Sequence, residues 1–245
     1  MSKAVLVDTT LCLYCNACTV ECKRENEVPE GFWRTRMEER ERGAYPDVKM
    51  NFVKRQCMHC EHPACASVCT VGALQKTPEG PVTYDASKCI GCRYCMYACP
   101  YGVPKFEWDK PLGLIEKCTF CDHRQAVGLE PACTSACPFG ALTFGERDDL
   151  IVKAYQRIGE HPDRYIRHVF GEHEGGGISW LYLSSIPFES LGLPELDEKP
   201  RTEAAVTVMN ATPVTIVVAG AVLGGLYKFA QRREKGLAEK QEQEA

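Results

Sequence analysis

Short apolar stretches next to turn signals are the main pattern in the first two-thirds of the chain. Runs of about four to eight β-branched and apolar residues bounded by glycine, proline or asparagine-type turns predict strands. We expect strands over residues 4–8, 73–76, 82–85, 112–116 and 141–144. These strands are too short and too scattered for one large sheet, so they indicate small α+β modules.

A longer segment, 147–167, has the apolar spacing of an amphipathic helix. Its apolar positions are Leu150, Ile151, Ala154 and Ile158. Gly175 to Gly177 interrupt the pattern, and a further strand is expected over 178–183. The charged stretch from Arg34 to Arg42, which holds four Arg and three Glu, is interpreted as a solvated surface insertion.

Residues 204–227 form an uncharged segment of 24 positions. This length is greater than the roughly 20 residues that a helix needs to cross a bilayer. Polar residues and a proline weaken the first half, so a buried helix of a soluble protein is the alternative. These residues are Thr207, Asn210, Thr212 and Pro213. Three glycines in the second half would let a partner helix approach closely. We predict one membrane helix over 204–228.

Basic residues follow this helix and are scarce before it. After it come Lys228, Arg232, Arg233, Lys235 and Lys240, whereas Lys199 and Arg201 precede it amid five acids. The positive-inside rule predicts a cytoplasmic tail, 229–245, and places the preceding domain on the periplasmic or extracytoplasmic face. Residues Met1 to Val5 show no secretory signal or twin arginine, so we expect a partner subunit to carry the folded domain across the membrane.

Composition adds one unusual feature, which is sixteen cysteines in 245 residues. The charged fraction of 25% and the net charge of −4 exclude a disordered chain and give no basic face for nucleic acid. The cysteines form four runs of four with none left over. The runs are Cys12, Cys15, Cys18, Cys22; Cys57, Cys60, Cys65, Cys69; Cys89, Cys92, Cys95, Cys99; and Cys118, Cys121, Cys133, Cys137.

The first and third runs read C-x2-C-x2-C-x3-C, and Pro100 follows the third, which is the bacterial ferredoxin spacing for a [4Fe–4S] cluster. Three thiolates within seven residues wrap one corner of a cluster, and the fourth leaves on a short helix. We expect such helices over 20–25 and 96–99. Four runs therefore predict four clusters. Disulfides or four-thiolate zinc sites are the alternatives, and the three closely spaced cysteines argue against both.

The sequence also repeats itself. Val5 to Cys22 aligns without gaps on Val82 to Cys99 at a shift of 77 positions. The second and fourth runs match at a shift of 61, which becomes 68 from Pro63 onward, so the fourth run carries a seven-residue insertion. Repeats at fixed offsets indicate duplicated structural units.

Nothing else in the chain resembles a catalytic group, so no catalytic residue is assigned. His59, His62 and His123 lie beside cysteines and are interpreted as polar loop residues. Tyr14, Tyr94, Tyr97 and Tyr101 are expected to shield the clusters from water.

The run from Cys89 to Tyr101, the Pro131-Ala-Cys133 motif and the stretch from Gly175 to Pro194 resemble four-cluster ferredoxin-like subunits of respiratory oxidoreductases. That family includes the β subunit of formate dehydrogenase-N and the ferredoxin-like subunit of hydrogenase-2. Thr70 departs from its pattern, because a proline usually follows the fourth cysteine.

The resemblance implies that the first run pairs with the fourth and the second with the third, although spacing alone leaves the sequential pairing open. One cluster would bind Cys12, Cys15, Cys18 and Cys137; the second Cys22, Cys118, Cys121 and Cys133; the third Cys57, Cys60, Cys65 and Cys99; and the fourth Cys69, Cys89, Cys92 and Cys95.

The implied domains are an outer ferredoxin module in two halves, 1–53 with the insertion and 107–146, around an inner two-cluster module, 54–106. A C-terminal extension, 147–203, leads to the membrane helix. The implied function is electron transfer from a catalytic subunit to a membrane cytochrome b or other quinone-reactive subunit. The leading catalytic partner is a molybdenum or tungsten formate dehydrogenase; nickel–iron hydrogenase, favoured by the 186–194 segment, and other molybdopterin oxidoreductases are the alternatives.

Overall fold

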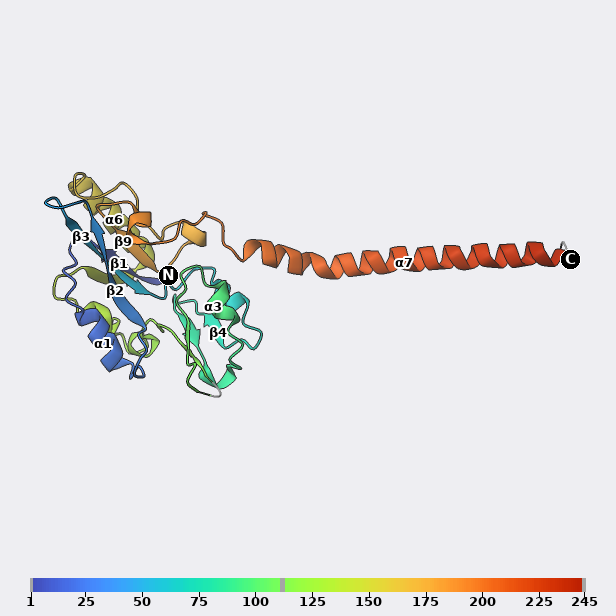
Figure 1. Ribbon diagram of the computed structural model, residues 1–245, viewed down its shortest axis with the longest axis horizontal. Coiled ribbons are helices and arrows are strands. Elements are labelled where there is room, and N and C mark those ends of the chain that lie inside the picture. The colour runs from blue at the N-terminus through green and yellow to red at the C-terminus, as the bar shows by residue number, and fades with distance from the viewer. Residues whose placement is uncertain (1, 111–112, 244–245) are drawn as a thin grey trace. The chain divides into compact units, whose positions relative to one another are not determined.

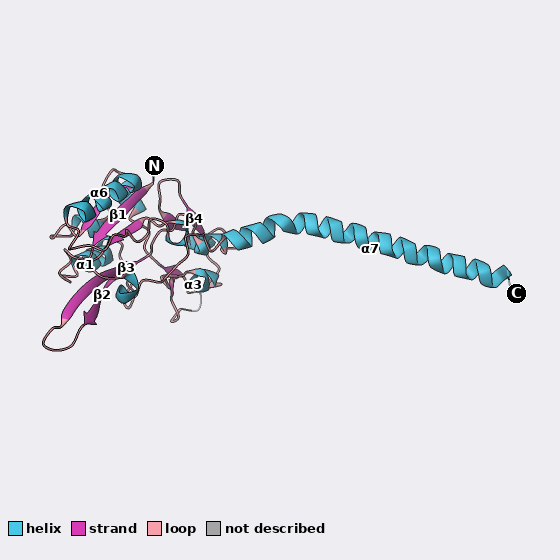
Figure 2. Ribbon diagram, turned by 90° about the horizontal axis from the view of Figure 1, so that it is seen from above, coloured by secondary structure: helices cyan, strands magenta, loops and turns pink. Residues whose placement is uncertain are grey.

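The computed structural model describes residues 2–110 and 113–243 and divides into two units, Met1–Arg201 and Thr202–Ala245 (Figure 1). The first unit mixes short helices with short strands (Figure 2), as expected for an α+β fold. Its strands are β1 (Lys3–Asp8), β2 (Thr35–Arg42), β3 (Lys49–Gln56), β4 (Leu74–Lys76), β5 (Val82–Tyr84), β6 (Lys105–Phe106), β7 (Ile115–Glu116), β8 (Leu142–Glu146) and β9 (Trp180–Leu183). Its α-helices are α1 (Ala17–Glu25), α2 (Ala64–Ser67), α3 (Tyr94–Ala98), α4 (Asp122–Gln125), α5 (Ala132–Ser135) and α6 (Arg147–Glu160).

Five of the six predicted strands form within one or two residues of the expected bounds. For the strand expected over 112–116, Leu112 lies outside the described residues and β7 covers only Ile115–Glu116. The helix expected over 147–167 is shorter than predicted. It ends at Glu160 because Pro162 disfavours helical geometry at the preceding residue, and His161 is indeed non-helical.

The central sheet of the first unit has the order β8-β1-β9, with β1 antiparallel to β8 and parallel to β9. Both faces of β1 are buried. Leu6 packs with Leu150 and Ala154 of α6 on one face, whereas Val5 and Val7 on the other face join the core that contains Cys18 and Cys133. The sheet thus separates the α6 layer from the cysteine loops and gives those loops a rigid floor.

The internal repeat is visible in the strand pairing. In the inner part of the chain Leu74 pairs with Tyr84, and in the outer part Leu142 pairs with Val7. The shift of 77 carries Val7 onto Tyr84, and the shift of 68 carries Leu74 onto Leu142. The β8–β1 and β4–β5 pairs therefore have the same register, so the first and fourth runs flank one sheet and the second and third runs flank another.

The charged stretch from Arg34 to Arg42 forms a strand, which corrects its interpretation as a loosely solvated insertion. It builds the β2–β3 hairpin, where Thr35 pairs with Gln56 (Figure 2). Several charged residues of β2 are exposed, but Val53, Lys54 and Gln56 of β3 are buried. Val53 and Lys54 are adjacent and both buried, so both faces of β3 are covered near its end, whereas its first four residues are exposed or half-exposed.

The expected position of the short helices is wrong for three of the four runs. Among the fourth cysteines of the runs, only Cys22 lies on a helix, whereas Cys69, Cys99 and Cys137 follow the ends of α2, α3 and α5. It is the third cysteine of each run that is helical. Pro63 and Pro131 directly precede α2 and α5, where a fixed φ of about −65° and a missing N–H cost no helical hydrogen bond. The fourth cysteine is thereby released from the helix.

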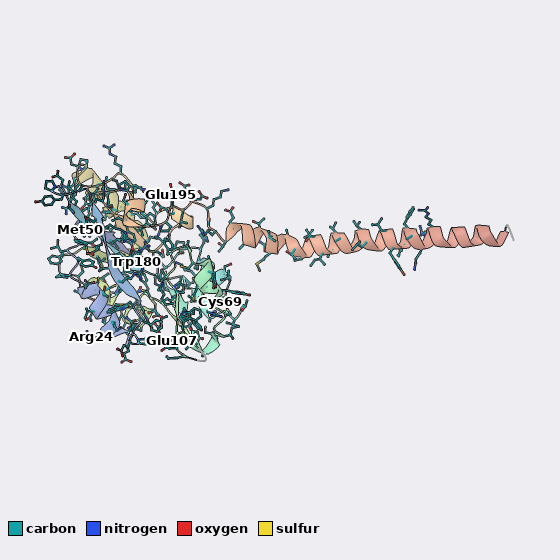
Figure 3. All side chains as sticks on the ribbon, viewed as in Figure 1. Arg24, Met50, Cys69, Glu107, Trp180 and Glu195 are labelled. Atoms are coloured by element: carbon teal, nitrogen blue, oxygen red, sulfur yellow. The ribbon has the colours of Figure 1, made fainter. Side chains whose placement is uncertain are left out.

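The second unit is the helix α7 (Glu203–Gln243), within which residues 206–233 are long and apolar enough to cross a membrane. Its side chains are drawn in Figure 3. Two of the polar residues that weakened the sequence signal are satisfied within the helix. Thr207 Oγ1 donates to the Glu203 carbonyl at 2.9 Å, and Thr212 Oγ1 donates to the Val208 carbonyl at 2.7 Å. Hydroxyls satisfied within the helix are compatible with an apolar surrounding.

Two positions on α6 test the sheet-facing layer. Leu150→Ala removes a side chain that is 4% exposed, and we expect it to destabilise the first unit by about 2–5 kcal/mol. Val152→Ala on the same helix, at a side chain that is 68% exposed, should change stability by less than about 0.5 kcal/mol. Urea unfolding of the anaerobically purified full chain in detergent measures both. Equal effects of the two substitutions would contradict the packing.

Candidate functional site: the cysteine loops

Each cysteine run begins with the same backbone turn. The second residue after the first cysteine has a positive φ in all four runs: Tyr14 (59°), His59 (47°), Gly91 (68°) and Phe120 (64°). Three of them are not glycine, and such a conformation costs about 1–2 kcal/mol. The turn aims an N–H at the preceding sulfur, as when Phe120 N donates to Cys118 Sγ at 3.3 Å. Backbone strain of this kind concentrates at functional sites.

The first site is the Cys12 cavity, which lies between the first run, β3 and the start of β8. It is lined by Cys12, Cys15, Cys18 and Cys137 together with Val7, Met37, Phe52, Lys54 and Leu142 among others. Three cysteines come from the first run and one from the fourth, more than one hundred residues away in sequence. This is the first ligand set that the family resemblance implies.

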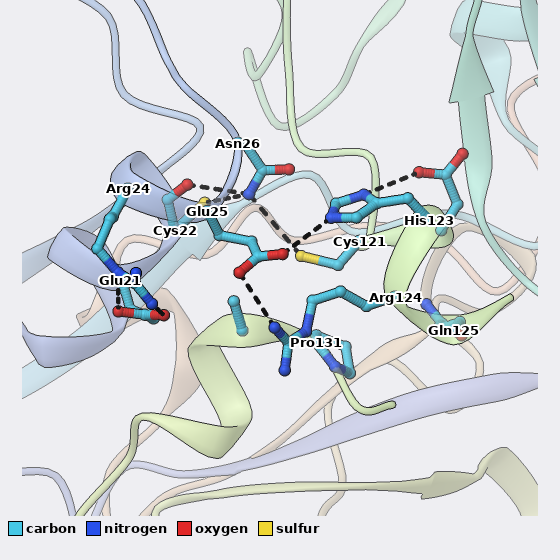
Figure 4. Close-up of polar contacts among 12 residues, drawn as sticks. Glu21, Cys22, Arg24, Glu25, Asn26, Cys121, His123, Arg124, Gln125 and Pro131 are labelled. Carbon is cyan, nitrogen blue, oxygen red and sulfur yellow. Dashed lines mark hydrogen bonds and ion pairs between the residues drawn. The ribbon is translucent and has the colours of Figure 1, made fainter. Parts of the chain in front are cut away.

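The second site is the Cys22 cavity, lined by Cys22, Cys118, Cys121 and Cys133 with Lys54, Phe120 and Trp180 among its other walls. Figure 4 shows how α1 and α4 are joined beside it. Glu25 accepts from Arg124 Nη1 at 3.0 Å and lies 3.1 Å from His123 Nε2. The Asn26 amide donates to Cys22 Sγ and Cys121 Sγ, each at 3.8 Å, so one side chain contacts two of the four sulfurs.

The third site is the Cys89 cavity of the inner part, lined by Cys69, Cys89, Cys92 and Cys95 with Leu74, Tyr84, Ile90 and Tyr94 among others. Ala73 N donates to Cys69 Sγ at 3.2 Å. The Cys12, Cys22 and Cys89 cavities enclose about 450, 300 and 340 Å³ respectively, so they are of comparable size. Four cysteines line each one, which suggests that each receives the same kind of group.

The remaining four predicted ligands form the Cys57 group: Cys57, Cys60, Cys65 and Cys99. Burial, followed by repulsion from Cys57, Cys99 and Cys65, raises the pKa of Cys60. Burial and the Cys57 thiolate likewise raise the pKa of Cys65 to about 12. These four thiols are close enough to oppose one another's ionisation. The cavities thus gather twelve of the sixteen cysteines in three of the expected groups, and Cys57, Cys60, Cys65 and Cys99 lie near one another.

The electrostatics of these groups call for a cation. Burial raises the pKa of Cys133 to about 12 and, in the Cys89 cavity, that of Cys95 to about 11. Thiolates gathered in such surroundings need positive charge in place of their protons, and iron supplies it. All sixteen cysteines are free of disulfides.

The geometry also distinguishes between kinds of metal site. In residues 2–110 and 113–243, no three His, Cys, Asp or Glu side chains converge closely enough to hold a single ion. A zinc site would bring four sulfurs to about 2.3 Å from one centre. A [4Fe–4S] cluster gives each thiolate its own iron, so its four sulfurs stand further apart around a hollow.

The four groups follow one another in a linear order. The thiolate of Cys18, in the Cys12 cavity, raises the pKa of Cys133 in the Cys22 cavity. Cys57 is the thiolate with the largest effect on Cys118 of the Cys22 cavity. The thiolate of Cys95, in the Cys89 cavity, raises the pKa of Cys65 in the Cys57 group. The order is therefore Cys12 cavity, Cys22 cavity, Cys57 group, Cys89 cavity.

The histidines and tyrosines near the runs differ from their sequence interpretation. His59 is not a polar loop residue, because it is fully buried, stacks on Phe120 at 4.8 Å and accepts from Val82 N at 2.8 Å. His62 and His123 are exposed or half-exposed, as expected. Tyr14 stacks on Phe52 at 5.0 Å and the hydroxyl of Tyr101 is buried, so both shield the interior. Tyr97 is 88% exposed, so its side chain does not shield the interior.

Two buried lysines were missed by the sequence reasoning. Lys54 lines the Cys12 and Cys22 cavities, and Lys117 donates to the carbonyls of Val82 and Cys118. Lys117 directly precedes a cysteine, which is a local signal that could have been used. Lys54 lies in a charged stretch far from the cysteines of its own site, and no local signal marks it.

Comparison with known proteins agrees with this geometry. Residues 48–147 match the family model of a 4Fe–4S dicluster domain. The chain is 33% identical to the hydrogenase-2 operon protein HybA of Shigella flexneri, over 96% of its own length and 85% of the relative. It is 44% identical over 154 residues to the thiosulfate reductase electron transfer subunit PhsB of Salmonella typhi, covering 62% of this chain and 79% of the relative.

The chain belongs to the ferredoxin-like electron-transfer subunits of oxidoreductases. A protein of Nitratidesulfovibrio vulgaris strain Hildenborough is 42% identical to this subunit over 98% of the chain and 70% of the relative. This iron–sulfur subunit carries [4Fe–4S] clusters and works beside a catalytic subunit. Its likeness to HybA extends over nearly the whole chain, whereas the dicluster match covers the second, third and fourth runs.

Proposed function

We propose that the subunit holds four [4Fe–4S] clusters and relays single electrons between a catalytic subunit and a membrane subunit. The observation that carries the proposal is the sharing of each cavity by cysteines of two runs. The proposed ligands are Cys12, Cys15, Cys18, Cys137; Cys22, Cys118, Cys121, Cys133; Cys57, Cys60, Cys65, Cys99; and Cys69, Cys89, Cys92, Cys95. When bound, each cluster accepts and releases one electron, and the residues around it set its potential.

The exposure of the cysteines supports a relay with two open ends. Cys15 and Cys92 are the exposed members of the sixteen, and they belong to the first and last groups of the linear order. Leu13 and Ile90, the residues that accompany them, are 61% and 64% exposed. All four cysteines of the Cys22 cavity are buried and none of the Cys57 group is exposed, whereas each terminal group has an exposed cysteine that a donor or an acceptor can approach.

The equal register of the β8–β1 and β4–β5 pairs supports the nested domain arrangement. In this arrangement residues 1–53 and 107–146 form the outer module, 54–106 the inner module, and 147–203 the C-terminal extension. Two strand pairs cross these bounds: β3 (Lys49–Gln56) continues past residue 53, and β6 pairs with β7, so we count the whole β2–β3 hairpin with the outer module. The extension completes the outer module, because α6 and β9 pack on β1.

The leading hypothesis for the catalytic partner is a formate dehydrogenase, and a nickel–iron hydrogenase or another molybdopterin oxidoreductase is the alternative. The likeness to HybA over 96% of the chain, including the segment from Ile186 to Pro194, favours a nickel–iron hydrogenase as the second candidate. On the membrane side we propose a cytochrome b or another quinone-reactive subunit, reached through the apolar part of α7.

We propose that α7 crosses the membrane once, with 229–245 in the cytoplasm and the cysteine-rich unit on the periplasmic face. The support is the length and hydropathy of residues 206–233 and the basic residues after Tyr227.

The ligand sets predict which cysteine variants share a phenotype. The anaerobically purified full chain should contain about 16 Fe, and Cys15→Ser and Cys137→Ser should alter the same EPR signal because both line the Cys12 cavity. Cys22→Ser should alter a different signal. Ser135→Ala, beside two ligands but not one itself, should leave all signals unchanged. If Cys15→Ser shares its signal with Cys69→Ser and not with Cys137→Ser, the sequential pairing is correct instead.

The relay predicts that loss of a terminal ligand uncouples the partners. In the purified complex we expect quinone reduction with formate or with hydrogen, whichever the catalytic partner oxidises. Cys15→Ser should lower the rate of quinone reduction by more than about tenfold. The rate of dye reduction at the catalytic subunit should stay within about twofold of the wild-type rate. Quinone reduction that survives Cys15→Ser at wild-type rates contradicts the relay.

The orientation predicts opposite protease accessibility of the two ends. A peptide tag fused after residue 245 should be digested in inside-out vesicles and protected in spheroplasts, because basic flanks stay in the cytoplasm. An antibody epitope placed in the β2–β3 loop should be protected in inside-out vesicles and digested in spheroplasts. Digestion of both from the cytoplasmic side would place the cysteine-rich unit in the cytoplasm.

A further inference from the structure

Lys54 is a buried cation without a carboxylate partner. Its side chain is 2% exposed, and Nζ donates to Thr35 Oγ1 at 2.6 Å and to Gln56 Oε1 at 3.3 Å. Nζ also lies 4.3 Å from the ring centre of Trp180. Both acceptor oxygens are neutral, and Lys54 forms no ion pair within the part of the chain that the structure describes. A lysine is almost never this buried unless it is paired, so its location requires an explanation.

Two other basic side chains near the cavities pair with carboxylates, whereas the buried Lys117, which lines neither cavity, donates to backbone carbonyls. Arg34, which also lines the Cys22 cavity, pairs with Glu116 at 2.8 Å. Lys76 pairs with Glu61 at 3.2 Å. Thr35 and Gln56 orient Lys54, and Trp180 supports it through a cation–π contact, but none of the three supplies a negative charge.

The position of Lys54 supplies the missing counter-charge. It is the one described residue that lines both the Cys12 cavity and the Cys22 cavity. Thr35 and Gln56 hold Nζ beside both cavities. The cysteines that line the two cavities lose their protons when iron binds, and those thiolates are then the groups that compensate the ammonium.

We infer that Lys54 sets the reduction potentials of the two centres proposed for the Cys12 and Cys22 cavities, as a positioning charge shared between them. The inference rests on the proposed ligand sets. A fixed positive charge stabilises the more negative, reduced form of an adjacent centre and therefore raises its potential. Because the charge lies between two cavities, both centres should respond. The Cys89 centre, whose cavity Lys54 does not line, and the Cys57 centre, where Lys117 is the lysine with the largest effect on Cys57, should not.

The decisive variant is Lys54→Met, which keeps most of the side-chain volume and removes the charge. In the purified full-chain complex, titrated anaerobically with dithionite and followed by EPR, the reduction equilibrium of two centres should become about tenfold less favourable, which is about 59 mV. The other two centres should remain within about twofold. Lys54→Arg, which keeps the charge, should stay within about twofold at all four centres.

Lys117→Met is the matched control, because Lys117 is also 2% exposed but lines neither cavity and donates to the carbonyls of Val82 and Cys118. Its charge acts on Cys57 and Cys118, so its loss should alter the Cys57 and Cys22 centres and leave the Cys12 centre unchanged. Iron content separates this inference from the proposed function, which fails if the wild-type chain holds far fewer than about 16 Fe.

Unchanged potentials in an iron-replete Lys54→Met chain would overturn the inference. Equal shifts at all four centres would do the same, because they would indicate general loosening of the fold. If Lys54→Met loses iron, Lys54→Gln replaces it; iron loss in both, with Lys54→Arg intact, would assign Lys54 to assembly and overturn the role in setting potential.

Discussion

The fold depends on gathering cysteine thiolates in buried surroundings that disfavour the ionised form of a thiol. Burial and mutual repulsion raise the pKa of Cys133 to about 12 and that of Cys95 to about 11, so the empty cavities favour protonated thiols. Only positive charge reverses this preference, and iron supplies it as protons leave. The elements around the cavities are short: β6 and β7 have two residues each, and α2 and α5 have four. Such elements are not stable alone, so cluster loading and folding must be coupled.

The duplicated modules share their ligand pattern but not their surroundings. The outer module gains a third strand, β9, a covering helix, α6, and the β2–β3 hairpin, none of which has a counterpart in the inner module. Its two cavities are consequently lined by Phe52, Trp180 and a buried ammonium. The Cys89 cavity is lined instead by Ile90 and Tyr94, which are 64% and 59% exposed. Equal ligands in unequal surroundings give unequal potentials, so the asymmetry of the insertions creates differences along the relay.

Local features of the sequence predicted the four cysteine runs and most strands, because cysteine spacing and the shifts of 77 and 68 are properties of the chain itself, whereas the assignment of each cysteine to a cluster came from the family resemblance. Two buried side chains were missed because their burial depends on distant contacts. His59 and Lys54 look polar in sequence but are buried by Phe120 and Trp180, which lie more than sixty residues away. The helices differ for a local reason: each begins before the third cysteine of its run, after Pro63 and Pro131 in the second and fourth runs and after Asn16 and Arg93 in the first and third.

The middle of the relay is sealed where the two modules meet. Cys118 and Cys57 are buried neighbours there, the His59 ring stacks on Phe120 at 4.8 Å, and Lys117 ties the Val82 and Cys118 carbonyls together. These contacts come from both modules, so water is excluded only when the modules are assembled. A reduced centre exposed to solvent would lose its electron to any small oxidant. The fold restricts such exposure to Cys15 and Cys92, at the two ends where a partner subunit can cover them. Sealing the junction and leaving the ends open are therefore complementary requirements of one relay.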